Sequence, residues 1–170
     1  MSEHKCLNVG CGPRLFTSPW VNADLLEDIG SDVVMDIEKS WPWEDNTFDQ
    51  VWASHVAEHC FDKVHFIKEA WRVSKPGATV QIDVPLYSWS MFWDDPTHKS
   101  CWTERSLTWF QQGHPHHGAQ PFKGGAEFVV EKFALRDGWE LAWLLRVVKP
   151  GQPDCAHAPI EIQQPGGMSK

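Results

Sequence analysis

Long apolar runs are missing from this sequence, since no stretch approaches the roughly 20 residues that a membrane-spanning helix needs. The segment before Cys6 is polar and runs straight into a strand-like segment, so it does not resemble a secretory signal. We therefore expect no membrane association and a cytoplasmic protein. The five cysteines are scattered and form no Cys-x-x-Cys pair, which favours reduced thiols over a disulfide framework.

Positive charge is in the minority, because 23 Asp and Glu residues outnumber 15 Lys and Arg residues and give a formal net charge of −8. Phosphate contacts from Lys and Arg supply most of the affinity for nucleic acids, so this balance argues against an extensive nucleic-acid surface. Tyrosine is also scarce, with one residue against eleven tryptophans. The tryptophans fill a small core, form an interface such as that of a homodimer, or line an aromatic pocket for a ligand.

The length of 170 residues suits one domain with an ordinary hydrophobic core. We expect residues 1–150 to form this domain. Residues 151–170 are rich in proline, glycine and glutamine, so they predict an extended or disordered tail.

Short apolar runs alternate with polar turns along the first half of the chain. They predict buried strands at residues 5–9, 20–23, 33–35, 48–53 and 78–84. The segments before the second and third of these strands are too short for a full crossover helix. Helical spacing of apolar residues predicts a helix from the N-cap Asp62 to Val73, stopped by residues 75–77.

The second half begins with an aromatic and acidic loop at residues 86–102. A helix is expected from its cap Thr103 to Phe110, followed by a flexible loop at residues 111–125. Apolar runs on both sides of Asp137-Gly138 then predict an antiparallel hairpin. The expected fold is α/β: a mostly parallel sheet with layers on both faces and a C-terminal antiparallel hairpin.

Two glycines follow the first predicted strand, and they mark the stretch around which the chain is organised. Gly10 and Gly12 can adopt positive φ and carry no Cβ, so the chain can turn sharply and a ligand can approach its backbone. Open α/β sheets place nucleotide ligands at such turns. Acidic residues follow at the ends of the next two predicted strands, Asp24 and Asp36.

Several segments, in this order and spacing, resemble class I S-adenosylmethionine-dependent methyltransferases of the type 11-like group, in a variant with a shortened first helix. The resemblance implies a Rossmann-like sheet that binds S-adenosylmethionine. It also implies methyl transfer to an oxygen or nitrogen of a small-molecule or glycan-type acceptor, which leaves S-adenosylhomocysteine. The segments that carry it are residues 7–13, 21–25, 33–37, 41–49, 53–59, 71–77 and 95–98.

The resemblance assigns cofactor contacts to the ends of the first, second, third and fourth strands. Gly10 and Gly12 let the backbone pass close to the ribose and the methionine part, and the Asp24 carboxylate can accept two hydrogen bonds from the ribose diol. Family likeness assigns Asp36 to the adenine amino group. The full predicted set is Asn8, Gly10, Cys11, Gly12, Asp24, Leu25, Asp36, Ile37, Ser54 and His55.

Two positions depart from the family's pattern. Asn8 stands where an acid is common, and its amide oxygen can still accept a hydrogen bond from the ammonium of the methionine part. Arg14 stands where a third glycine is frequent. It either clashes with the ligand or reaches the carboxylate of the methionine part.

Methyl transfer from a sulfonium is an in-line displacement, for which positioning alone can contribute about 7–11 kcal/mol. An alcohol or a protonated amine must also lose a proton, and a histidine with a near-neutral pKa suits that role. The candidate bases are His55, His59 and His98, with Asp95 as an orienting partner.

Two other functions compete with this one. The pattern His55-x-x-Glu58-His59 matches the inverted zinc-protease motif of metal-dependent hydrolases, but that motif needs a long helix and a predicted strand ends just before it. We therefore expect no metal there. The sequence also permits a non-catalytic S-adenosylmethionine-binding or accessory module. The sequence also leaves open whether a metal binds His114, His116 and His117 together with Asp94 or Asp95.

Overall fold

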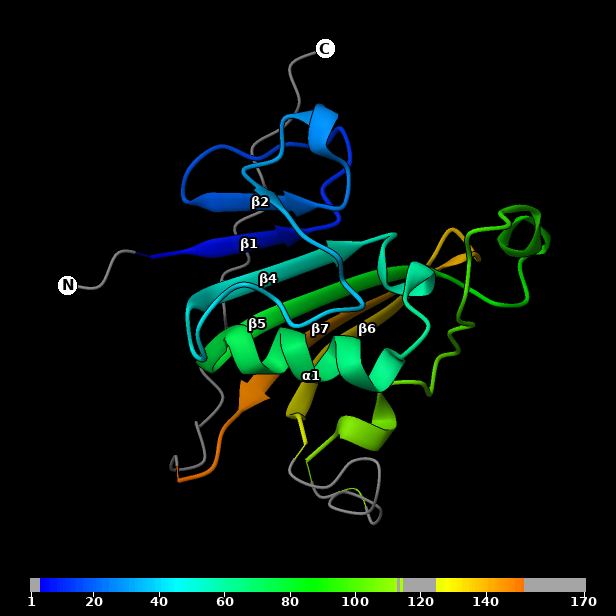
Figure 1. Ribbon diagram of the computed structural model, residues 1–170. Coiled ribbons are helices and arrows are strands. Elements are labelled where there is room, and N and C mark those ends of the chain that lie inside the picture. The colour runs from blue at the N-terminus through cyan, green and yellow to red at the C-terminus, as the bar shows by residue number, and fades with distance from the viewer. Residues whose placement is uncertain (1–3, 113, 115–124, 152–170) are drawn as a thin grey trace.

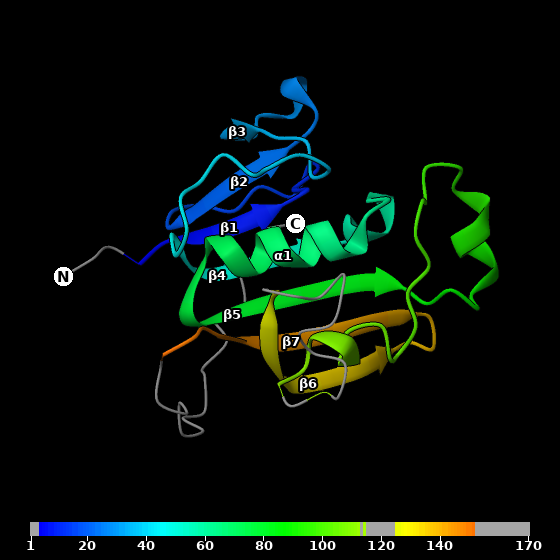
Figure 2. The same cartoon turned by 60° about the horizontal axis from the view of Figure 1, so that its bottom comes forward.

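A seven-stranded sheet forms the centre of the computed structural model, which describes residues 4–112, 114 and 125–151 (Figure 1). The strand order is β3-β2-β1-β4-β5-β7-β6, and Figure 2 shows β3 at the edge beyond β2. The first five strands pair in parallel, whereas β7 is antiparallel to both β5 and β6. The strands are β1 (Cys6–Val9), β2 (Trp20–Asp24), β3 (Val33–Val34), β4 (Phe48–Ser54), β5 (Ser74–Pro85), β6 (Glu127–Arg136) and β7 (Glu140–Val148).

This sheet confirms the predicted fold class and the C-terminal hairpin. The turn between β6 and β7 contains Asp137 and Gly138, where the sequence predicted the hairpin, and both residues have positive φ. Most of the expected loop at 111–125 and the expected tail at 151–170 lie outside the described residues. Among the described residues, no helix combines the length and apolar character that a bilayer span requires.

The helix α1 (Lys63–Val73) covers one face of the sheet and lies along β5 in Figure 1. Its predicted N-cap is confirmed, because Asp62 Oδ1 accepts a hydrogen bond from the backbone N–H of His65 at 3.0 Å. Apolar side chains at helical spacing, among them Phe66, Ile67 and Ala70, are fully buried against the strands. This contact forms the main hydrophobic core.

The opposite face differs from the prediction of layers on both faces, because no second α-helix occurs in the described part of the chain. Asn8, Trp52 and Gln81 pair across β1, β4 and β5, and strand alternation points them away from α1. The β1–β2 connection is too short for a helix, and it forms turns instead. It contributes Phe16, whose ring stacks on Trp52 at 4.8 Å between centroids.

The sequence predicted that residues 75–77 form a turn that stops α1, but these residues belong to β5. The helix ends at Val73, and β5 begins at once with Ser74. Phe48 pairs with Ser74 and Gln50 with Thr79, so the register shift lets the proline and glycine bulge out of the strand.

The expected helix from Thr103 to Phe110 is also wrong, since this segment forms turns followed by one 3₁₀ turn, η4 (Thr108–Phe110). Hydroxyl groups compete with the helical pattern here, because Ser106 Oγ accepts from Thr103 N at 2.9 Å and Thr108 Oγ1 donates to Arg105 O at 2.8 Å. Other 3₁₀ turns are η1 (Glu27–Ile29), η2 (Ala57–His59) and η3 (Ser90–Asp94), the last inside the predicted loop at 86–102.

Arg72 ties the loop before β4 to the end of α1. Its guanidinium donates to the backbone oxygens of Trp41 and Trp43 at 3.0 and 2.7 Å, and to Asp45 at 2.9 Å. It also pairs with Glu69, whose second oxygen accepts from Trp41 N at 2.7 Å. One side chain therefore satisfies two backbone carbonyls and a buried carboxylate.

Replacing Arg72 with leucine is expected to lower the free energy of unfolding by about 2–4 kcal/mol, because Glu69 and both carbonyls lose their partner. Urea unfolding followed by tryptophan fluorescence measures this change. The control is Lys39→Met, which breaks an exposed pair with Asp36 and should cost less than about 1 kcal/mol. Equal losses in the two variants would contradict the role given to Arg72.

Candidate functional site

The turn after β1 is shaped by two glycines with different surroundings. Gly10 has φ +63°, and a Cβ there would lie 2.2 Å from Val56 Cγ2. Gly12 has φ +50°, but no heavy atom of the residues that the structure describes lies within 4 Å of the place its Cβ would take. Gly10 therefore lets the turn pack against the segment that follows β4, whereas Gly12 leaves the backbone accessible from open space.

Asp24 holds this turn from the carboxyl end of β2. Its Oδ2 accepts a hydrogen bond from Gly12 N at 2.9 Å, and its Oδ1 accepts from Leu26 N at 3.0 Å. Cys11 N also donates to Ala23 O at 3.1 Å. Each carboxylate oxygen has a second lone pair, so Asp24 can hold the turn and still accept hydrogen bonds from a diol.

Asp36 follows β3, one strand farther from β1. The backbone N–H of Glu38 donates to its Oδ1 at 2.9 Å and is the main cause that lowers the pKa of Asp36. Met35 N donates to Asp24 O at 2.7 Å, which brings the two acidic strand ends together. Leu25 is 62% exposed beside Asp24, while Ile37 packs partly against the core.

Asn8 and Arg14 both make contacts within the protein. Asn8 is buried, and its amide nitrogen donates to Arg14 O at 2.9 Å and to Asn22 Oδ1 at 3.1 Å. The Arg14 guanidinium lies over the Trp52 ring, 5.4 Å from its centroid, on the face away from α1. Asn8 therefore braces the glycine turn from inside the protein.

His55 leaves β4 with φ +53°, and its N–H donates to Asp83 O at 2.8 Å. Its ring lies between two carboxylates, with Nε2 2.8 Å from Glu140 Oε1 and Nδ1 3.5 Å from Glu58 Oε1. The Glu58 carboxylate is the largest cause that raises the pKa of His55 to about 9, opposed by burial and reinforced by Glu140. A protonated His55 at neutral pH differs from the near-neutral base that the sequence suggested.

The other three predicted catalytic candidates do come together. The rings of His59 and His98 are 4.9 Å apart, and Asp95 Oδ2 lies 3.7 Å from His98 Nε2. Glu58 lies between them and His55, because its Oε1 is 4.0 Å from His98 Nε2. The segment after β4 therefore meets the loop at residues 95–98 beyond the carboxyl ends of the strands.

Sequence reasoning missed the residues that the C-terminal hairpin brings to this edge. Glu140 at the start of β7 contacts His55, and Arg136 lies 3.0 Å from Glu140 and 3.4 Å from Asp83. Burial raises the pKa of Asp83, whose Oδ2 accepts from Trp52 Nε1 at 3.0 Å. The only signal in the sequence was that Arg136 ends one predicted apolar run and Glu140 precedes the next.

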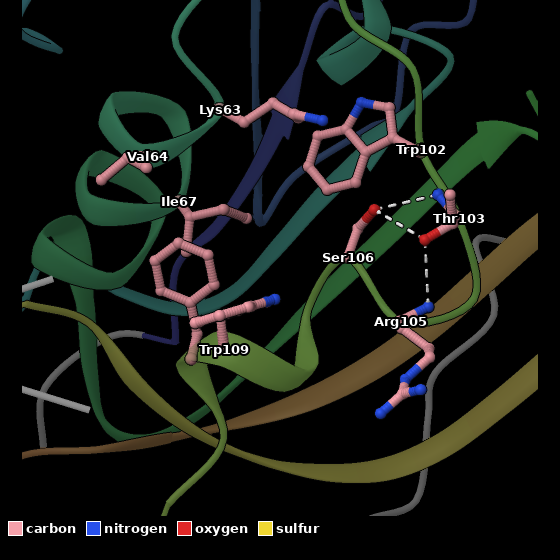
Figure 3. A pocket seen from close by; sticks show the side chains of 9 residues that line it. Lys63, Val64, Ile67, Trp102, Thr103, Arg105, Ser106 and Trp109 are labelled. Carbon is pink, nitrogen blue, oxygen red and sulfur yellow. Dashed lines mark hydrogen bonds between the residues drawn. The ribbon is translucent and has the colours of Figure 1, made fainter. Parts of the chain in front are cut away.

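A pocket of about 300 Å³ lies between the start of α1 and residues 102–110 (Figure 3). Lys63 and the buried Trp102 form part of its wall, and none of the predicted cofactor residues lines it. Two other pairs of tryptophans lie in contact, with Trp102 near Trp143 and Trp89 stacked on Trp139 at 4.6 Å between ring centroids. The pocket is therefore separate from the edge occupied by His55.

Comparisons with known proteins agree with this arrangement. Residues 7–82 match a family model described as a methyltransferase domain. Tocopherol O-methyltransferase of Arabidopsis thaliana is 46% identical over 41 residues, which are 24% of this chain and 12% of that protein. The chain thus matches only a small part of this curated relative.

Solved structures share the fold over most of the chain. A methyltransferase dependent on S-adenosylmethionine (SAM) from Archaeoglobus fulgidus superposes with a TM-score of 0.56 at 16% identity, covering 85% of this chain and 86% of that one. Another from Methanosarcina mazei gives 0.59 at 14% identity, covering 87% and 94%. The chain therefore has the fold of class I SAM-dependent methyltransferases and, over residues 7–82, the sequence pattern of the methyltransferase domain.

Proposed function

We propose that the protein binds S-adenosylmethionine and transfers its methyl group to an oxygen or nitrogen of a small-molecule or glycan-type acceptor. The observation that carries this proposal is the pairing of Gly12 with Asp24. An open backbone turn at the end of β1 is fixed by a carboxylate at the end of β2, with Asp36 one strand farther. This spacing suits the methionine part, the ribose and the adenine in that order.

The proposed cofactor contacts are the predicted ones with a changed role for Asn8. Gly10, Cys11 and Gly12 approach the ligand with their backbone, and Asp24 accepts hydrogen bonds from the ribose diol. The tocopherol O-methyltransferase, which is 46% identical over 41 aligned residues, supports oxygen as an acceptor atom. Specificity for the acceptor lies in the loops that follow the strands.

Proton removal is the step for which the charge distribution matters. His55 carries its proton between Glu58 and Glu140, so it supplies a positive charge and a hydrogen-bond donor beside the proposed methyl group. We assign the proton of the acceptor to the group formed by Glu58, His59 and His98, with Asp95 beside it. Holding the acceptor in line with the S–CH₃ bond supplies most of the rate.

Replacing Asp24 with alanine is expected to abolish binding of S-adenosylmethionine and S-adenosylhomocysteine while the domain stays folded. For the native protein, ligand at a hundred times its dissociation constant should add about 2.7 kcal/mol to the free energy of unfolding. Thermal-shift titration with and without a chelator measures this. The matched control is Asp28→Ala, an exposed acid in η1, and unchanged affinity in Asp24→Ala would sink the proposed site.

Turnover is tested by supplying S-adenosylmethionine with hydroxyl and amino acceptors of the small-molecule and glycan classes, and by measuring released S-adenosylhomocysteine. We expect S-adenosylhomocysteine to be released with either the hydroxyl or the amino acceptors. Ligand binding without release from any acceptor would favour the non-catalytic module instead.

Gly10→Ala is expected to impair mainly the stability of the fold, and Gly12→Ala mainly the binding of the cofactor. Gly10→Ala should lower the free energy of unfolding by about 2–5 kcal/mol, because its Cβ overlaps Val56 at positive φ. Gly12→Ala should cost only the strain of positive φ, about 1–2 kcal/mol, and weaken cofactor binding. The control is Gly77→Ala, which has φ +77° and open space far from the turn. Calorimetric titration that finds equal cofactor affinity in Gly12→Ala and Gly77→Ala would contradict the placement of the ligand.

A further inference from the structure

We propose that Glu58, His59 and His98 form a binding site for a divalent transition-metal ion of the zinc type. One potential ligand atom from each residue lies within 4.8 Å of those of the other two. From the sequence we expected no metal here, because the motif of His55 and His59 needs a long helix and a predicted strand ends just before His55. In the structure the strand ends at Ser54 and η2 starts at Ala57, and His98 comes from a distant loop in place of His55.

His98 is oriented as a metal ligand by its own hydrogen bond. Its Nδ1 lies 2.7 Å from the backbone oxygen of Phe92, which can only accept, so Nδ1 carries the proton. In the neutral ring Nε2 then holds a lone pair. That lone pair faces Asp95 Oδ2 at 3.7 Å and Glu58 Oε1 at 4.0 Å, which are acceptors as well. A metal cation placed between these three acceptors would bind all of them.

His59 shows the same arrangement. Its Nδ1 lies 3.2 Å from the backbone oxygen of Thr97 and 3.0 Å from Thr97 Oγ1. A proton on Nδ1 satisfies the carbonyl and leaves Nε2 as an acceptor. Histidines that bind metals characteristically donate their second ring N–H to a carbonyl or carboxylate, which fixes the tautomer and the ring orientation.

Glu58 supplies the observation that is independent of the two histidines. Its side chain is 1% exposed, and within the described residues Oε2 has no hydrogen-bond partner. A buried carboxylate oxygen without a partner is costly, so such groups are paired or coordinate a metal. The nearby His55 reaches only Oε1. Oε2 of Glu58 is therefore available to bind a metal ion.

The backbone builds this site firmly. Glu58 O accepts from both Lys99 N at 2.8 Å and Ser100 N at 3.0 Å, which clamps the loop that carries His98 onto η2. Two imidazole nitrogens and a carboxylate oxygen suit Zn²⁺ and its neighbours in the first transition row rather than Mg²⁺ or Ca²⁺. Bonds of about 2.0–2.2 Å would draw the three ligand atoms closer together by small side-chain rotations. Asp95 lies at the rim as a further oxygen donor.

The test uses the full chain after dialysis against a chelator, with Zn²⁺ as the probe and a chromophoric zinc indicator as competitor. Native protein should bind one equivalent. Glu58→Gln, His59→Gln and His98→Gln should each weaken binding by at least about tenfold. The matched control His65→Gln, on α1 with its ring bonded to Lys39 O, should bind as the native protein does. Replacement by Co²⁺ should give a visible absorption band that the three ligand variants lose.

A second variant separates the proposed site from the other histidines of the chain. His114, His116 and His117 are replaced together by glutamine, and this triple variant should keep its zinc affinity. Loss of zinc in the triple variant, native affinity in the Glu58 and His98 variants, or no zinc binding by the native protein would each overturn the proposal.

Folding and cofactor binding are followed in the same samples. Circular dichroism shows whether each variant is folded, and if Glu58→Gln is not, the partly exposed His59 and His98 variants decide the outcome. The metal site does not depend on the proposed cofactor site, but it uses the side chains to which we assigned the acceptor's proton, so a bound metal would replace that role of the group. Zinc binding without S-adenosylmethionine binding would reject the proposed function alone, and the reverse result would reject the metal site alone.

Discussion

The hydrogen bond from Gly12 N to Asp24 Oδ2 fixes the part of the molecule on which the proposed function depends. It joins the turn after β1 to the end of β2, and the backbone contact between Met35 and Asp24 extends this edge to β3. Because the strands are parallel, their carboxyl ends meet at one edge, and β4 delivers His55 to the same place. The proposed cofactor and acceptor groups converge through strand direction rather than through sequence proximity.

A second constraint is the buried charge of Glu58. The segment after β4 turns the carboxylate inward, where it meets His55 on one side and His98 on the other. Glu140 pairs with His55 and also with Arg136. The β6–β7 hairpin therefore contributes two charged side chains to this group of ion pairs. Charges from four separate segments thus depend on one another at the edge where the proposed chemistry takes place.

The local pattern of the sequence predicted the strands, the capped helix and the final hairpin, because these depend on apolar spacing and turn residues. It failed where hydroxyl groups compete with a helix at residues 103–110, and where a register shift absorbs Pro76 and Gly77 into β5. The sequence correctly placed the glycines of the candidate site after the first strand and its two aspartates at the ends of the next two strands. The partners of His55 and Glu58 could not be predicted, because Glu140 and His98 reach them only through the pairing of distant segments.

The most direct measurement of the central claim is a crystal structure of the protein with S-adenosylhomocysteine. The account predicts that the ligand lies across the carboxyl ends of β1, β2 and β4. Its ribose hydroxyls should bond to Asp24, its adenine should lie beside Asp36, and its sulfur should point toward His55. Ligand density in the pocket between α1 and residues 102–110, with the turn at Gly12 left open, would contradict the account.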